Sequence, residues 1–138
     1  MTEHPQPPAP LPADLGGLTV LVVEDHAIGR VLLEAMLGGL GVAARLVGSG
    51  EEARAAISNE RFDAILIDLG LPDIHGEDLA RMLVRALPAS PPPMIAVTGR
   101  ERPSRLPAVF ADWLEKPFSV RDLHRLLASV TDRGRLSA

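Results

Sequence analysis

The chain has 138 residues, no cysteine and a net charge of −4, and 46% of its residues are hydrophobic but only 3% aromatic. These values are typical of a single domain with an aliphatic core. The acidic balance argues against DNA binding, and the lack of cysteine excludes disulfides and thiolate metal sites. No apolar stretch approaches the roughly 20 residues of a membrane span, and no secretory leader is present, so we expect a cytoplasmic protein without membrane contact.

Three regions are expected along the chain. Residues 1–17 are rich in proline and polar residues, and we interpret them as a disordered tail, although such a segment could also dock into a proline-binding groove. Residues 18–132 carry alternating apolar and amphipathic segments and form the predicted folded domain. Residues 133–138 form a short C-terminal tail. We find no internal repeat and no second domain.

Within the predicted domain, five short runs rich in Val, Ile and Leu alternate with helical patterns. Such alternation implies right-handed crossovers and an α/β fold with a doubly wound parallel sheet. The expected strands are Leu18–Glu24, Val42–Val47, Phe62–Asp68, Met94–Thr98 and Ala111–Glu115. The expected helices are His26–Gly38, Glu51–Asn59, His75–Leu87 and a final helix from Val120 to Val130. The buried side of the first helix is expected to hold Ile28, Val31, Leu32, Ala35 and Met36.

Polar groups follow four of the expected strands directly. They are Glu24 and Asp25, Asp68, Thr98 and Lys116. Because parallel strands end at one edge of a sheet, and ligands of such sheets bind at that edge, these groups should converge. Two carboxylates about 4 Å apart repel by roughly 4 kcal/mol at an effective dielectric of about 20, so three together need a counter-ion. The set suits a divalent metal and a phosphoryl group.

Four motifs carry a family resemblance over Leu18 to about Thr131: VLVVEDH, ILIDLGLPDIHG, AVTG and WLEKPF. In this order the chain resembles the receiver domain of bacterial two-component response regulators. The resemblance implies a flavodoxin-like fold with strand order 2-1-3-4-5. It also implies that Asp68 is the phosphoacceptor and that Glu24, Asp25 and Asp68 hold Mg²⁺ together with the backbone carbonyl of Gly70. A carboxylate can attack a phosphoryl group when a metal neutralises the incoming charge.

The same resemblance assigns three further residues. Lys116, in a Lys-Pro step that is often cis in the family, would contact the phosphoryl oxygens, and Thr98 would be the switch hydroxyl. Trp113 stands at the switch-aromatic position, which is normally tyrosine or phenylalanine. Each of three assignments has a purely structural alternative. Thr98 would be an ordinary strand residue, Trp113 would pack on an edge strand, and Asp25 would cap the first helix.

The stretch from Gly99 to Asp112 departs from the family. It is about one helical turn shorter than in the usual receiver and contains Pro103 and Pro107. Proline inside a helix costs about 3 kcal/mol, so the fourth helix should be short, displaced or absent. We expect this stretch to be mobile before phosphorylation and to become ordered after it.

Other motifs favour ordinary structural roles. Residues 48–50, Gly-Ser-Gly, lack a complete phosphate-loop pattern and are interpreted as a turn into a helix. His26, His75 and His124 lack metal-ligand spacing, so we expect them to be solvated or to cap helices.

The predicted function is therefore a stand-alone response regulator, monomeric or dimeric, since no effector domain follows in the sequence. It would accept a phosphoryl group from a histidine kinase or histidine phosphotransfer protein, with output by protein contact or phosphorelay. It would not be an enzyme, beyond catalysing its own phosphorylation and dephosphorylation. One alternative is a pseudo-receiver adaptor that works without phosphorylation. A small Mg²⁺-dependent phosphatase is a second alternative, but no residue stands out as its general acid.

Overall fold

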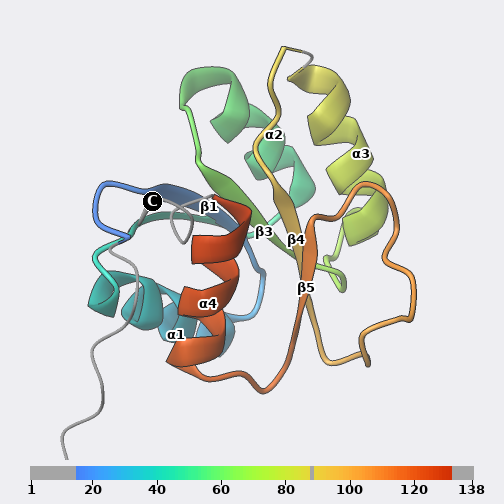
Figure 1. The fold of residues 1–138 in the computed structure, drawn as a ribbon. Helices are drawn as coiled ribbons and strands as arrows, with labels where there is room; N and C mark the ends of the chain where they lie inside the picture. Colours follow the sequence, from blue (N-terminus) through green and yellow to red (C-terminus); the bar gives the residue numbers. More distant parts are fainter. Residues whose placement is uncertain (1–14, 88, 132–138) are drawn as a thin grey trace, which may run out of the picture.

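The structure, a computed structural model, describes residues 15–87 and 89–131. Five parallel strands form one sheet in the order β2-β1-β3-β4-β5, which confirms the predicted fold and strand order. The strands are β1 (Thr19–Val23), β2 (Ala43–Val47), β3 (Ala64–Asp68), β4 (Met94–Thr98) and β5 (Asp112–Glu115). The helices are α1 (Ala27–Gly39), α2 (Gly50–Asn59), α3 (Gly76–Ala86) and α4 (Val120–Val130). Figure 1 shows α1 and α4 on one face of the sheet and α2 and α3 on the other.

The sheet is buried on both faces because its central strands consist of apolar residues without a polar interruption. Side chains of a strand alternate between the two faces, so each central strand supplies both core layers. One layer joins Val20, Val22, Leu66, Ile95 and Val97 to Leu33, Leu37, Leu123 and Leu127 of α1 and α4. The other joins Leu21, Val23, Ile65, Ile67 and Met94 to Ala53, Ile57, Leu79 and Leu83 of α2 and α3.

The buried side of α1 differs from our prediction. Leu33 and Leu37 are its buried residues, whereas Ile28, Val31 and Leu32 are exposed by 82%, 68% and 51%. Of the other two residues predicted on that side, Ala35 is exposed and Met36 is partly buried against the core layer of α1 and α4. Apolar residues occur on every side of this helix, so their spacing alone does not show which side meets the sheet. The helix rests on the sheet through residues four apart, and its N-terminal half presents an apolar surface to solvent.

Local signals explain where two other helices begin. The hydroxyl of Ser49 accepts a hydrogen bond from the Glu52 N–H at 3.2 Å, so residues 48–50 are indeed a turn into a helix. At α4, Ser119 and Asp122 form a reciprocal capping box. Asp73 adds a contact that no local pattern predicts, since its carboxylate accepts from the N–H groups of Gly50 and Glu51. The Gly50 N–H in particular lowers the pKa of Asp73.

No helix forms between β4 and β5, in a segment that the structure describes completely. This agrees with the prediction that the fourth helix of the receiver fold is short or absent. The label α4 therefore denotes the helix that follows β5. The β4–β5 segment, residues 99–111, runs as loop and turn, and Ala111 donates its N–H to the carbonyl of Met94 at 2.8 Å, where the pairing of β5 with β4 begins.

Our predictions for residues 1–14 and 132–138 lie outside the described residues. Leu15, which we placed in the N-terminal tail, is 1% exposed and belongs to the α1–α4 core layer. Packing therefore begins before Leu18, and the division into a domain and two tails stays a prediction. Within residues 15–87 and 89–131, no helix is long and apolar enough to cross a membrane. The cytoplasmic location stays a prediction.

Candidate functional site

The polar residues that follow β1 and β3 meet at the carboxyl edge of the sheet. Val23 pairs with Ile67 in the register of β1 and β3, so Glu24 and Asp68 stand at the same level. Oxygen atoms of Glu24, Asp25 and Asp68 all lie within 4.8 Å of one another. Among the described residues these three form the one group of acidic or histidine side chains close enough to share a metal ion.

Glu24 is the most enclosed member of this acidic cluster, with only 2% of the residue exposed. Its Oε1 lies 3.3 Å from the ammonium nitrogen of Lys116, whereas its Oε2 is buried without a hydrogen-bond partner. Burial, followed by the close carboxyl group of Asp68 and its negative charge, raises the pKa of Glu24 to about 7. Lys116 opposes this rise only in part. As the pH falls, Glu24 therefore takes up a proton before Asp68 does.

Asp68 responds in the opposite direction. Burial by itself would raise the pKa of Asp68, but the neighbouring carboxyl group of Glu24, the Gly70 N–H and the charge of Lys116 outweigh it and lower that pKa. The Gly70 N–H donates to Asp68 Oδ1 at 3.0 Å. Of the two carboxylates, Asp68 is thus the one that stays ionised to lower pH.

Thr98 and Lys116 lie beside each other at the ends of the neighbouring strands β4 and β5. The Lys116 N–H donates to the Thr98 carbonyl at 2.7 Å, which ties the two backbones together. The Thr98 hydroxyl oxygen accepts a hydrogen bond from the Arg100 N–H at 3.1 Å. The Lys116–Pro117 bond is cis, as we predicted from the Lys-Pro step.

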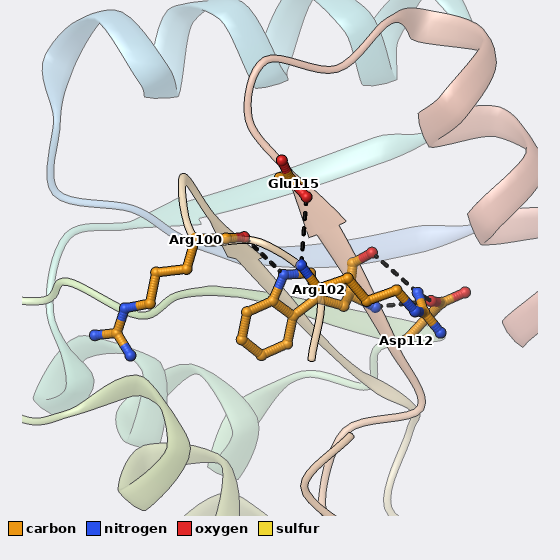
Figure 2. A network of polar contacts seen from close by, with 5 residues as sticks. Arg100, Arg102, Asp112 and Glu115 are labelled. Carbon is orange, nitrogen blue, oxygen red and sulfur yellow. Dashed lines mark hydrogen bonds and ion pairs between the residues drawn. The ribbon is translucent and has the colours of Figure 1, made fainter. Parts of the chain in front are cut away.

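Trp113 packs in the core layer of α2 and α3, where its ring meets Phe110 edge to face at 6.4 Å. Its indole N–H donates to the Arg100 carbonyl at 3.1 Å. Figure 2 shows the surrounding contacts. The guanidinium of Arg102 donates to Oδ1 of Asp112 at 2.5 Å, and the backbone N–H of Arg102 donates to Oε1 of Glu115 at 3.3 Å. The β4–β5 segment is thereby fastened to β5 although it contains no helix.

The donor set fits a hard divalent cation. All its side-chain ligands are carboxylate oxygens, which Mg²⁺ prefers, and the unpartnered Oε2 of Glu24 is a buried acceptor that a cation or its water would satisfy. Histidine is not part of the cluster, which disfavours zinc. The role predicted for the Gly70 carbonyl stays a prediction, because the contact found for Gly70 is made by its N–H. Asp25 does not cap α1, whose N-cap is His26, without a side-chain hydrogen bond.

The model of the response regulator receiver domain matches residues 20–128, which include every member of the acidic cluster and all five strands apart from Thr19 at the start of β1. The chain belongs to this family. Receiver domains serve two-component signalling and bind Mg²⁺ at an acidic pocket, and this chain has a cluster of three carboxylates. The resemblance inferred from the four motifs is confirmed.

Relatives and solved structures agree with this assignment. The aerobic respiration control sensor protein ArcB of Escherichia coli is 32% identical over 127 residues, which cover 89% of this chain and 16% of ArcB. The chain spans about half or less of the length of the curated relatives it matches. A CheY-like receiver domain from Methylobacillus flagellatus is 34% identical, with a TM-score of 0.72 over 82% of this chain and 98% of that one.

A second solved structure bears on the metal. The receiver domain of the sensor histidine kinase PA1611 from Pseudomonas aeruginosa is 30% identical, with a TM-score of 0.70 over 85% of this chain and 99% of that one. In that protein a magnesium ion is coordinated in the active-site cleft. The likeness supports the choice of cation made above from the carboxylate donors.

Three features of the site escaped sequence reasoning. The first is Gly29, which lies directly against Glu24. The second is the pair Arg100 and Arg102, whose contacts hold Trp113 and β5. The third is His124, which is only 2% exposed although we expected it to be solvated or to cap a helix. His26 and His75 are exposed, as expected. The contacts of Arg100 and Arg102 and the burial of His124 arise only when the chain folds, and no spacing rule marks them. The sole local signal was a glycine inside a helical pattern at position 29.

Proposed function

We propose that this receiver domain accepts a phosphoryl group on Asp68 from a histidine kinase or a histidine phosphotransfer protein, with Mg²⁺ held by Glu24, Asp25 and Asp68. The observation that carries the proposal is the convergence of these three carboxylates within 4.8 Å, with Lys116 in contact with one of them. Such a group is costly to assemble in an unliganded protein, because like charges in a partly buried site repel. Its arrangement suits a cation and a phosphoryl group together.

The roles of the chain's own residues follow from their contacts. Gly70 holds Oδ1 of Asp68, so Oδ2 is the oxygen that attacks phosphorus; an O–P bond forms while the N–P bond of the donor phosphohistidine breaks and the imidazole nitrogen takes a proton. Lys116 and Thr98 then bind the transferred oxygens, one as a cation and the other as a hydroxyl donor. When bound, Mg²⁺ neutralises charge on the phosphoryl oxygens.

The donor has to bring its histidine to this edge of the sheet, and we place it against the exposed apolar half of α1. Ile28, Val31 and Leu32 supply this surface. Leu32 lines one hollow of about 330 Å³ with Glu24 and Lys116, and Val31 lines another with Asp25. Contiguous exposed apolar side chains of this kind are typical of protein contact sites.

The direct test is phosphorylation by acetyl phosphate with and without Mg²⁺, followed by intact-mass and peptide mass spectrometry. One phosphoryl group on Asp68 that requires Mg²⁺ is the expected result, and Asp68→Asn should incorporate none while keeping a cooperative melting transition. Asp63→Asn, which alters an exposed carboxylate just before β3 and at the opposite end of that strand from Asp68, is the matched control and should be phosphorylated like the wild type. Incorporation in Asp68→Asn, or none in the wild type, would contradict the proposal.

A pseudo-receiver adaptor is the second candidate, and one observation favours it. The indole of Trp113 is buried and bonded to the Arg100 carbonyl, which opposes the rotation expected of a switch aromatic. Hydrogen exchange with and without beryllofluoride and Mg²⁺ separates the candidates. A switching receiver should gain protection across residues 99–111, whereas an adaptor should show the same protection in both conditions.

Other parts of the predicted function stay predictions. Some curated relatives are transcriptional regulators, and the expectation that this chain makes no DNA contact stays a prediction. The stand-alone arrangement, the downstream protein and the choice between monomer and dimer need pull-down and sedimentation experiments on the full-length protein.

A further inference from the structure

Gly29 lies near the start of α1, where a glycine lowers helix stability relative to alanine. An added Cβ at this position would lie 2.1 Å from Oε1 of Glu24 and 3.0 Å from its Cδ. The two glycines at the other end of the same helix, Gly38 and Gly39, would place a Cβ in open space. The backbone of Gly29 is not in the left-handed region, so its conformation does not demand glycine. The reason for glycine at position 29 is therefore steric.

The side chain of Glu24 occupies the room that Gly29 leaves. A terminal carboxylate normally avoids a close neighbour by changing rotamer, but Glu24 is only 2% exposed and its Oε1 is engaged with Lys116. Moving the carboxylate aside would break that ion pair and would displace the side chain from Asp68, whose carboxylate lies within 4.8 Å of it. Aspartate is one methylene shorter than glutamate, so its oxygens would stop short of α1.

We propose that Gly29 is a positioning residue for Glu24. The missing side chain at position 29 forms the recess that holds the longer carboxylate beside Lys116 and Asp68, and glycine at 29 and glutamate at 24 function as a matched pair. As far as it concerns magnesium, this inference rests on the proposed function. The steric pairing itself holds for the metal-free protein.

The test is a double-mutant cycle on the full-length protein. It compares wild type, Gly29→Ala, Glu24→Asp and the double variant, with Gly38→Ala as a matched control for adding a methyl group to α1. The readouts are the melting temperature without metal and the Mg²⁺ dissociation constant by calorimetry. Neither readout depends on phosphorylation activity, and the cycle isolates the interaction between the two positions.

Gly38→Ala should melt at or above the wild-type temperature, because alanine favours a helix. Gly29→Ala should melt roughly 5 °C below Gly38→Ala, the size expected for the loss of one buried contact in a small domain. It should bind Mg²⁺ about 10-fold more weakly than wild type, as happens when the support of a metal ligand is disturbed. In the Glu24→Asp background, adding Gly29→Ala should change neither the melting temperature nor the affinity more than Gly38→Ala does.

Two results would overturn the pairing. One is that Gly29→Ala has the same melting temperature and Mg²⁺ affinity as Gly38→Ala in the wild-type background. The other is that Gly29→Ala causes the same loss of melting temperature and affinity with glutamate as with aspartate at position 24. If Gly29→Ala does not fold, a folded double variant supports the inference and an unfolded one refutes it. A wild-type protein that binds no Mg²⁺ would refute the proposed function instead, while the metal-free melting cycle would still decide the pairing.

Discussion

Raising the pH from 5 to 8 without metal should destabilise the wild-type receiver domain more than its Glu24→Gln variant. Burial and the contact with Asp68 raise the pKa of Glu24 from 4.5 to about 7. Between these two values the folded protein keeps a proton that the unfolded chain has released. The free energy of unfolding therefore falls as the pH rises through this window, and it levels off above about pH 7.

The size of the effect follows from the shift. At about 1.4 kcal/mol per pH unit, a pKa raised from 4.5 to about 7 corresponds to a loss on the order of 3 kcal/mol. Asp68 has a lowered pKa, so its contribution is present throughout this range and is lost only in acid, below its ordinary value of 3.8. In Glu24→Gln the amide stays neutral and can still donate to Asp68, so this variant should lack the loss.

The assay is thermal unfolding followed by circular dichroism at pH 5, 6, 7 and 8, with EDTA present. The melting temperature of the wild type minus that of Glu24→Gln should fall by roughly 10 °C across the series. Calorimetry should also show Mg²⁺ affinity rising with pH, because binding requires ionised carboxylates. A melting difference that stays constant from pH 5 to 8 would refute the reasoning, since Glu24 would then carry the same charge in both states.

Three further variants probe other contacts. Trp113→Phe removes the indole donor and should lower the free energy of unfolding in urea by about 1 kcal/mol; an unchanged midpoint would show that the hydrogen bond contributes nothing. Arg102→Ala should cost under about 1 kcal/mol because the ion pair is half exposed, yet it should speed hydrogen exchange in the β4–β5 segment relative to the exposed control Arg105→Ala. Ser119→Ala breaks the capping box of α4 and should cost about 1 kcal/mol in urea unfolding, whereas equal losses in Ser119→Ala and Ser129→Ala would rule out the cap.

The strands and the acidic cluster were predictable because the relevant information is local. Runs such as residues 64–67 are apolar at every position, and only a strand covered on both faces satisfies that pattern. The residue that follows such a run is then placed at the sheet edge by chain connectivity alone. Hence the convergence of Glu24, Asp68, Thr98 and Lys116 at one edge follows from their positions along the chain.

Helix orientation could not be read in the same way. In α1 apolar side chains occur on all sides, so the exposed Ile28 and the buried Leu33 are equivalent by hydrophobicity. Which one is buried depends on how the helix rests on the sheet. His124 illustrates the same limit, because a residue of intermediate polarity becomes buried or solvated according to its neighbours.

By itself, therefore, the sequence determined the order and type of the elements, the edge where the carboxylates meet, and the lack of a helix in a proline-containing segment. Only the tertiary structure decided that Glu24 lies in the recess of Gly29, that Arg102 fastens the β4–β5 segment to Asp112, and that Asp73 caps α2. Backbone preference and hydrophobic burial act on neighbours in the chain or on whole segments. Steric fit and hydrogen bonding act over a few ångströms, so they are set only when packing has brought distant residues together.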